Sequence, residues 1–206
     1  ESWIQPAVDE LVIHFMRQHN RNAAIVHNTA QMYRHDRLKQ LEDALELAKD
    51  EGFKYGVKIV RGAYMEKERA RAAAMGYEDP IQPDKAASDR DYNAALHMAI
   101  TNLEHMAVVI GTHNEESVEL AASLMKKLMI KLNDERIYIA QLFGMSDHIS
   151  FNAAASGMNV AKYLPFGPVK DVLPYLFRRA EENTSVEGQT GRELGLIQSE
   201  LQRRKG

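Results

Sequence analysis

The sequence contains no cysteine, which excludes disulfides, iron–sulfur clusters, thiol nucleophiles and cysteine-bound zinc. It has no excess of basic residues: the formal net charge is −3 and the pI is near 6.3. Nucleic acid is therefore not expected as a partner, because phosphate binding requires a basic surface. No apolar run reaches the roughly 20 residues of a membrane-spanning helix. The glycine-rich motifs of common nucleotide-binding loops are also absent.

The sequence also lacks a recognisable metal-binding motif. His113 has no second histidine or carboxylate at metal-ligand spacing, so we expect no metal site. The 206 residues, 45% of them hydrophobic, are enough for one domain with a buried core, and we expect residues 1–206 to form a single domain. The chain begins at Glu1 with neither an initiator methionine nor a signal-like segment. We therefore expect it to be part of a longer protein.

Short apolar segments alternate with amphipathic helical segments along the chain. The pattern predicts strands at 23–28, 55–60, 107–111, 136–141 and 160–164. It predicts helices at 5–18, 36–51, 68–75, 85–105, 115–130, 146–156 and 168–183, with a C-terminal helical extension over 185–206. Such alternation is typical of an α/β fold with a parallel sheet, and the apolar strands indicate that both faces of the sheet are covered.

Polar residues at the predicted strand ends distinguish a β/α barrel from an open doubly wound sheet. They are Gln31, Arg61, Tyr64, Thr112, His113, Asn114, Gln141 and Tyr163. In a barrel all carboxyl ends meet in one ring, whereas an open sheet binds its ligands at a single switch point. We therefore predict a TIM-like (β/α)8 barrel. Because a whole barrel takes about 250 residues and eight units, only the later strand–helix units are expected here, with about three strands preceding Glu1.

Two adjacent arginines, Arg178 and Arg179, lie on the last strong helical segment. Helical spacing places them in one stripe with Tyr175 and Glu182, opposite an apolar face that we expect to pack. Planar guanidinium groups match a carboxylate bidentately. Most arginine pairs on helices merely face solvent, but Tyr163 and Tyr175 nearby favour a pocket for a small carboxylate.

Other polar residues allow two interpretations. Gly62 and Ala63 would let the backbone approach a flat cofactor, with Lys58 and Arg61 adding positive charge, or they would simply form a tight turn, which is the commoner case. The segment 112–114 would bind a cofactor or cap a helix, and the two remain open. The charged residues within 67–71 and 84–90 are expected on solvated helix faces.

Several separated motifs, taken together, resemble the proline dehydrogenase family. They are segments 58–64, 76–80, 112–114, 141–145 and 163–183, in the family's order, and they are more similar to the single-function and mitochondrial type than to the large bifunctional bacterial enzymes. The resemblance implies a distorted β/α barrel that binds FAD at the carboxyl ends of its strands. It implies oxidation of L-proline to Δ1-pyrroline-5-carboxylate by hydride transfer to flavin N5, with electrons passed to a membrane quinone.

The resemblance also implies roles for particular residues. Arg178 and Arg179 would hold the proline carboxylate, and Tyr64, Tyr163 and Tyr175 would enclose the ring. Lys58, Tyr163 and the two arginines would form the catalytic set. The residues that would touch FAD or brace the arginines are Gln31, Lys58, Arg61, Gly62, Ala63, Thr112, His113, Asn114, Gln141, Glu182 and Ser185.

The chain also departs from the family. Many bacterial members have arginine at the position of Lys58, and the lysine and aspartate that upstream strands contribute to the family's site are absent. We therefore expect that these 206 residues alone neither close the barrel nor turn over proline. Two alternatives remain open: an incomplete barrel that binds FAD or a small amino acid without turnover, and a related flavin barrel with another substrate. Proline and hydroxyproline are not distinguished.

The resemblance further implies where the protein acts. A quinone acceptor implies peripheral association with a membrane. The expected location is the cytoplasm or the inner membrane in a bacterium, and the mitochondrial inner membrane or matrix in a eukaryote.

Overall fold

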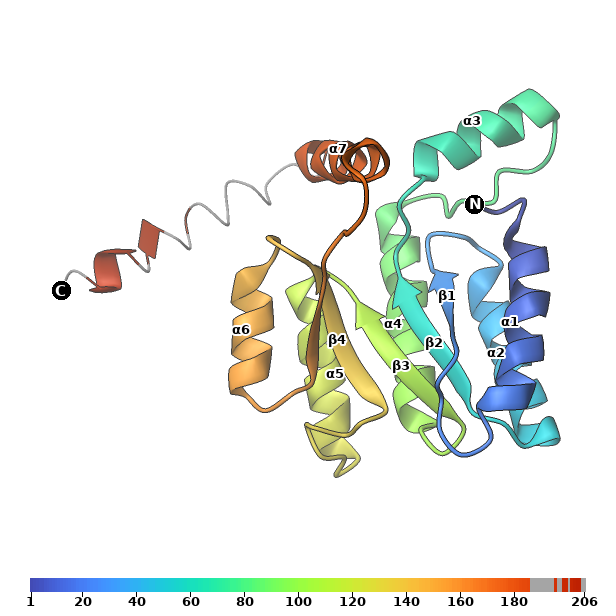
Figure 1. Cartoon of the computed structure of the whole chain (residues 1–206), viewed down its shortest axis with the longest axis horizontal. Coiled ribbons are helices and arrows are strands. Elements are labelled where there is room, and N and C mark those ends of the chain that lie inside the picture. Colours follow the sequence, from blue (N-terminus) through green and yellow to red (C-terminus); the bar gives the residue numbers. More distant parts are fainter. Residues whose placement is uncertain (186–194, 196–197, 200, 205–206) are drawn as a thin grey trace.

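The computed structural model describes residues 1–185, 195, 198–199 and 201–204, without the side chains of 178 and 180–185. Strands and helices alternate through residues 1–185, except that two helices follow the second strand (Figure 1). The strands are β1 His27–Gln31, β2 Tyr55–Val60, β3 Met106–Gly111, β4 Ile137–Leu142 and β5 Val160–Tyr163. The helices are α1 Gln5–His19, α2 Arg37–Glu51, α3 Met65–Met75, α4 Lys85–Thr101, α5 Glu115–Lys127, α6 Asp147–Ala155 and α7 Val169–Ser185.

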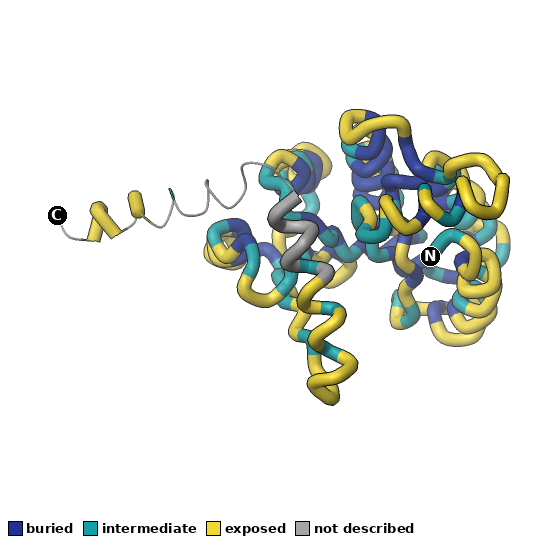
Figure 2. Tube along the Cα trace, turned by 90° about the horizontal axis from the view of Figure 1, so that it is seen from above, coloured by how far each residue is buried: buried dark blue, intermediate teal, exposed yellow. Residues whose placement is uncertain are grey.

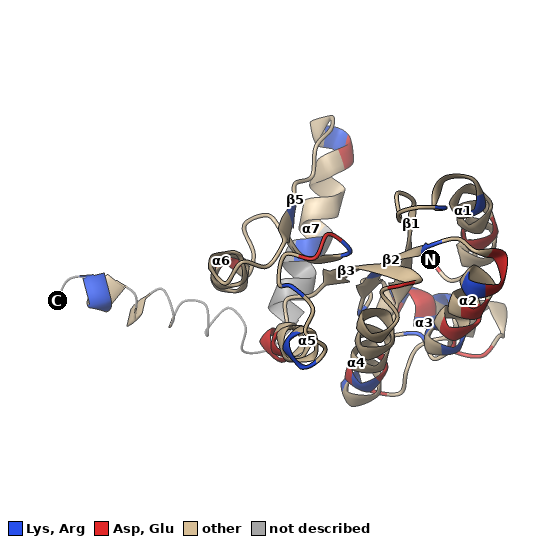
Figure 3. Cartoon of the chain, turned by 90° about the horizontal axis from the view of Figure 1, so that it is seen from below, with Lys and Arg blue, Asp and Glu red and all other residues tan. Residues whose placement is uncertain are grey.

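The strands form one parallel sheet in the order β1-β2-β3-β4-β5. Each strand pairs with its neighbours in sequence, so the order never reverses as it does in a doubly wound sheet. Helices α4 and α5 follow the same side of the sheet, as seen along the strands in Figure 3. This is the arrangement of consecutive β/α units in a barrel wall, and it confirms the predicted barrel class.

The core lies between the sheet and its helices, where buried residues concentrate (Figure 2). Val57 and Ile59 of β2 and Ile110 of β3 are completely buried. Tyr92 of α4 and Met125 of α5 are also 0% exposed and belong to the same cluster. Burial of this apolar surface is the main stabilising contribution, at about 25 cal/mol for each Å² removed from water. It fixes the sheet against the helices and thereby places the strand ends.

The first strand differs from its prediction at 23–28. Asn20 holds the preceding segment as a loop, because its side-chain oxygen accepts hydrogen bonds from the backbone N–H groups of Ile25 at 3.0 Å and Val26 at 2.8 Å. Its amide nitrogen donates to the Val26 carbonyl at 2.8 Å. These bonds occupy backbone groups that a strand would offer to β2, so pairing begins only at His27.

The predicted helices are present, with some shifted ends. Helix α3 begins at Met65 rather than 68, and α4 ends at Thr101 rather than 105. The end of α4 has a local cause, because the Asn102 side chain donates to the Met98 carbonyl at 2.9 Å and its backbone N–H bonds to Ala99. The predicted extension over 185–206 falls largely outside the described residues.

Two apolar helix faces are exposed. In α1, Val8, Leu11 and Phe15 are exposed whereas Met16 is fully buried. The face of α7 that we expected to pack is also exposed, at Val169, Leu173, Leu176 and Phe177. That expectation is wrong for this structure, because the described residues include no element that covers the face. No helix in the described part of the chain is both long and apolar enough to span a bilayer.

Candidate active site

The parallel strands bring the predicted site residues to one end of the sheet. Gln31 and Tyr163 end β1 and β5, and Gln141 is the penultimate residue of β4. Thr112 follows β3 directly, and Lys58 lies two residues before the end of β2. Helices α3 and α7 lie beyond these carboxyl ends (Figure 1). The sheet thus gathers residues from five strands beneath two helices.

An aromatic and cationic cluster joins β5, α7 and α3. The rings of Tyr163 and Tyr175 meet edge to face, with centroids 5.8 Å apart and planes at 66°. The Arg179 guanidinium carbon lies 5.2 Å from the Tyr175 ring centroid and 5.9 Å from that of Tyr64. Both distances are typical of cation–π contacts. The structure therefore brings together three predicted ring-enclosing tyrosines and one of the two predicted carboxylate-binding arginines.

Lys58 faces this cluster from β2. Its amine is 5.8 Å from the Tyr163 ring centroid, and burial lowers its pKa from the ordinary value. Gly111 on β3 allows β2 to approach closely, since a Cβ there would lie 2.8 Å from Val60 Cγ1, 3.0 Å from the Ile59 carbonyl oxygen and 3.3 Å from Lys58 Cε. Among the described residues no carboxylate pairs with the amine and no hydrogen bond reaches it. Lys58 is thus a partly desolvated donor directed at the site.

Arg61 extends from the end of β2 into a network of protein partners. Its guanidinium donates to Asp89 of α4 at 2.6 Å, and to the hydroxyls of Thr112 and Ser117 at 3.0 Å each. It also stacks on the Tyr92 ring at 4.3 Å. The structure therefore shows Arg61 bracing the ends of β2 and β3 against α4 and α5.

The segment after Arg61 is a tight turn. Gly62 has φ of 132°, and a Cβ there would lie 2.3 Å from Cδ1 of Tyr33. Only glycine fits both this backbone conformation and the close approach of the Tyr33 ring. Ala63 follows, and Tyr64 is the N-cap residue of α3. The described contacts thus explain Gly62 through packing.

The segment after β3 caps α5. The Asn114 side chain accepts from the Ser117 backbone N–H at 3.0 Å, and the Thr112 hydroxyl accepts from the Asn114 N–H at 3.0 Å. The capping interpretation of Asn114 therefore holds geometrically. His113 contacts the Ser146 hydroxyl through Nδ1 at 2.8 Å. Burial, together with the charge of Lys162, lowers the pKa of His113 to about 4, so the imidazole is neutral at pH 7.

Gln141 is almost fully buried and held at both ends of its amide. Its nitrogen donates to the Thr112 carbonyl at 3.2 Å, and its oxygen accepts from the Ser150 hydroxyl at 2.8 Å. These bonds tie the end of β4 to β3 and α6. Gln31 at the other edge is half-buried, and the side chains of Arg178, Glu182 and Ser185, all in α7, lie outside the described part of the structure.

Two acidic residues differ from the expectation of solvated helix faces. Glu68 is 0% exposed and accepts hydrogen bonds from Ser2, which is 66 residues away in sequence. Asp89 forms the ion pair with Arg61. Burial raises the pKa of Asp89, but hydrogen bonds from Lys85 and Arg61 lower it more, so the pKa lies below its ordinary value. Local charge patterning carries no signal for partners this distant, so sequence reasoning missed both residues.

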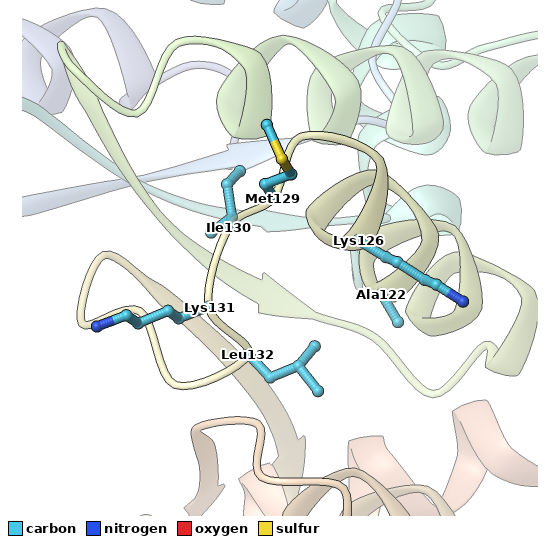
Figure 4. Close-up of a pocket in the computed structure, with 6 residues that line it drawn as sticks. All are labelled: Ala122, Lys126, Met129, Ile130, Lys131 and Leu132. Atoms are coloured by element: carbon cyan, nitrogen blue, oxygen red, sulfur yellow. The ribbon is translucent and has the colours of Figure 1, made fainter.

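A hollow of about 420 Å³ lies at the opposite end of the strands, lined by α5 and by the loop that follows it (Figure 4). Its lining residues are Ala122, Lys126, Met129, Ile130, Lys131 and Leu132. It contains none of the predicted site residues and is separate from the candidate site. Within the described ranges no group of three histidine, aspartate or glutamate side chains could hold a metal ion.

The fold and site define a class: a segment of a β/α-barrel protein with a tyrosine-lined site containing an arginine at the carboxyl ends of its strands. The family model for proline dehydrogenase matches residues 1–192. The chain belongs to the proline dehydrogenase family.

Similar proteins agree with the family. Human mitochondrial proline dehydrogenase 1 is 42% identical over 99% of this chain, which covers 34% of that protein. Hydroxyproline dehydrogenase of Xenopus laevis is 39% identical over 98% of this chain and 44% of that protein. The proline utilization A structure from Bdellovibrio bacteriovorus, inactivated by N-propargylglycine, has a TM-score of 0.83 at 25% identity, over 89% of this chain and 19% of that one.

These matches also show how much of the relatives is represented. The chain spans about a third of the length of the curated mitochondrial relatives it matches. Identity is higher to the mitochondrial enzyme than to the bacterial structure, in agreement with the predicted similarity to the mitochondrial type.

Proposed function

We propose that this protein oxidises L-proline to Δ1-pyrroline-5-carboxylate, using FAD as hydride acceptor and a quinone as final acceptor. The observation that carries the proposal is the position of Arg179, whose guanidinium carbon lies 5.9 Å from the Tyr64 ring centroid and 5.2 Å from that of Tyr175. A cation bordered by aromatic rings suits a small ring that bears a carboxylate. Membership of the family supplies the reaction class.

The residues at the strand ends fit a flavin. Lys58 offers a partly desolvated amine that meets no acceptor among the described residues, so it is available to a polar atom of a ligand. The Tyr163 ring beside it is 50% exposed and provides an apolar surface. Lys58, Gln31 and His113 would hold FAD, with Gln141, Arg61 and Thr112 bracing the strand ends beneath it. The cofactor supplies a two-electron acceptor when bound.

The protein's own residues then have a binding and orienting task. Arg179 and Arg178 would bind the carboxylate and fix one end of the substrate. Tyr163 and Tyr175, already packed edge to face, would hold the ring and exclude water. Lys58 approaches the Tyr163 ring to 5.8 Å from β2, whereas Arg179 lies on α7. The substrate would therefore bind between Lys58 and Arg179, beside the Tyr163 ring.

Hydroxyproline is a second candidate substrate, favoured by the 39% identity to the Xenopus laevis hydroxyproline dehydrogenase. Both substrates share the ring and the carboxylate, so both would use Arg179. A quinone acceptor would require peripheral contact with a membrane, and the names of the relatives favour a mitochondrial location.

The test uses the full-length protein, purified with its flavin. L-proline should bleach the oxidised flavin spectrum, and Arg179→Met should raise the proline KM about 100-fold, because a charged bidentate contact contributes about 3 kcal/mol. Pyrrolidine, which lacks the carboxylate, should lose little in the same variant. Lys39→Met, at an exposed lysine of α2, serves as the control with unchanged kinetics.

The outcomes separate the two parts of the proposal. Failure of proline and hydroxyproline to bleach the wild-type flavin would reject the activity. Bleaching with an unchanged proline KM in Arg179→Met would reject the carboxylate assignment while leaving the activity in place. A kcat/KM for hydroxyproline above that for proline would assign the second substrate.

A further inference from the structure

Helix α3 lies over the site without an apolar face that holds it. Only Glu68 and Ala72 of its eleven residues are buried, and the helix stands beyond the strand ends next to the N-terminus (Figure 1). Helices in proteins usually owe their position to a packed apolar stripe. The position of α3 must therefore depend on other contacts. Arg69 attaches α3 to the following segment, through an ion pair with Asp79 at 3.2 Å and a hydrogen bond to the Gln82 carbonyl at 3.2 Å.

Residues 1–3, the anchor segment, attach α3 from the N-terminal side of the chain, at Lys67, Glu68 and Arg71. Glu68 is completely buried, and its carboxylate accepts hydrogen bonds from the Ser2 backbone N–H at 2.7 Å and from the Ser2 hydroxyl. A buried carboxylate is costly unless such bonds are made. The pairing of Ser2 with Glu68 is therefore a fixed point between the anchor segment and α3.

Trp3 strengthens this attachment on the same face of α3. Its ring lies 4.3 Å from the Arg71 guanidinium carbon and 5.3 Å from the Lys67 amine. Lys67 and Arg71 are four residues apart and hence neighbours on the helix surface. Lys67 also pairs with Glu1 at 2.6 Å. Each residue of the anchor segment thus contacts α3.

The attachment leads to the substrate pocket. Tyr64 is the residue from which α3 starts, and its ring lies 5.8 Å from the Lys67 amine. The same ring lies 5.9 Å from the Arg179 guanidinium carbon. Lys67 is therefore bordered by Trp3 and Tyr64, and a displacement of α3 would move the tyrosine away from the arginine.

We propose that Ser2 and Trp3 are positioning residues that fix α3 and, through it, hold Tyr64 against Arg179. The inference rests on the proposed function only in identifying the Tyr64–Arg179 contact as part of the substrate pocket. The attachment of α3 itself follows from the contacts above. Because neither residue touches the proposed substrate position, their loss should affect proline binding through the placement of Tyr64.

The first test measures the attachment without any activity. Lys67, Arg69 and Arg71 are trypsin sites within α3. In the full-length protein under native conditions, Trp3→Leu should speed cleavage at these sites about tenfold, because two cation–π contacts are lost and the helix opens more often. Trp3→Phe keeps an aromatic ring and should restore most of the protection. Met75→Ala, at an exposed residue of the same helix, is the control.

The second test concerns the pocket. Trp3→Leu should raise the proline KM about tenfold with kcat changed less than twofold, and Trp3→Phe should recover most of the loss. The dissociation constant of a non-oxidisable five-membered-ring carboxylic acid, measured from the flavin spectrum, should rise in parallel. Ser2→Ala removes one of the two bonds to Glu68 and should produce the same pattern.

The results distinguish the inference from the proposed function. Cleavage of α3 in Trp3→Leu at the wild-type rate would overturn the attachment, whatever the substrate. Faster cleavage with unchanged KM and ligand affinity would overturn the link to the pocket. The wild-type protein could be inactive with proline while cleavage of α3 still follows the expected pattern. That result would reject the proposed function and leave the attachment of α3 supported.

Discussion

Replacing Arg61 should weaken the protein more than replacing any comparably paired surface arginine. Its guanidinium connects the end of β2 to α4, α5 and the segment after β3, through bonds of 2.6 Å to Asp89 and 3.0 Å to both Thr112 and Ser117. The side chains of Arg61 and Asp89 are only 23% and 27% exposed, so solvent screens their attraction incompletely. Arg61→Met removes all these bonds and keeps the aliphatic packing.

The contacts set the size of the effect. The charged bond to Asp89 is worth about 2 kcal/mol and the two bonds to hydroxyls about 1 kcal/mol together. Stacking on Tyr92 at 4.3 Å adds about 1 kcal/mol. Contacts of one residue are not additive, so we expect the free energy of unfolding to fall by about 3 kcal/mol. Arg61→Lys, which keeps one charge but loses the planar fork, should lose about half as much.

Urea denaturation of the full-length protein, followed by far-ultraviolet circular dichroism, measures this difference. Arg17→Met is the matched control, because Arg17 forms an equally short bidentate pair with Glu51 at 2.5 and 2.6 Å, but on the exposed surface. It should shift the midpoint little. The pKa of Asp89 is lower in the folded protein than its ordinary value near 4. The ion pair therefore stabilises the fold fully above about pH 4, and this stabilisation is lost as the pH falls through the lower, folded-state pKa. An Arg61→Met loss below about 1 kcal/mol, or one equal to that of Arg17→Met, would refute the reasoning.

Two further perturbations test the local geometry. Gly62→Ala should cost about 3 kcal/mol in unfolding free energy, because its Cβ would lie 2.3 Å from Cδ1 of Tyr33 on a backbone with φ of 132°. Gly76→Ala, with φ of 73° and open space around it, should cost only about 1 kcal/mol, and equal losses would contradict the steric argument. His113, whose pKa is lowered to about 4, stays neutral in the folded protein while the unfolded chain takes up a proton below about pH 6.5. The melting temperature should therefore decline from pH 6.5 towards 4, and it should decline less in His113→Gln. Equal declines in the wild type and the variant would contradict the lowered pKa of His113.

Much of the fold could be predicted because buried strands and helix faces appear in the sequence as apolar runs and apolar stripes. Strand β2 occupies the predicted residues 55–60, since Tyr55, Val57 and Ile59 of its apolar run are buried in the core. The first strand could not be located in the same way. The apolar residues at 23–26 precede the strand, and the bonds from Asn20 that hold Ile25 and Val26 in a loop depend on a side chain outside the run.

The candidate site shows the same division. Parallel strands must present their carboxyl ends together, so the placement of Lys58, Gln141 and Tyr163 at one end followed from the pattern. The hydrogen-bond partners of the site residues could not be predicted from the pattern. The partners of Arg61 lie 28 to 56 residues away in sequence, and Glu68 accepts hydrogen bonds from Ser2, 66 residues away. Residue type and spacing carry no information about such pairs until the fold brings them together.

The neighbour-by-neighbour order of the sheet also bears on how the chain is assembled during synthesis. Each new strand pairs with the one completed just before it, and no described pairing between strands waits for a segment that has yet to emerge. A domain that folds from its N-terminus on the ribosome can therefore add β2 through β5 one at a time to an existing edge. The growing edge is exposed only until the next strand–helix unit arrives, which limits the interval in which the nascent chain can pair with another molecule.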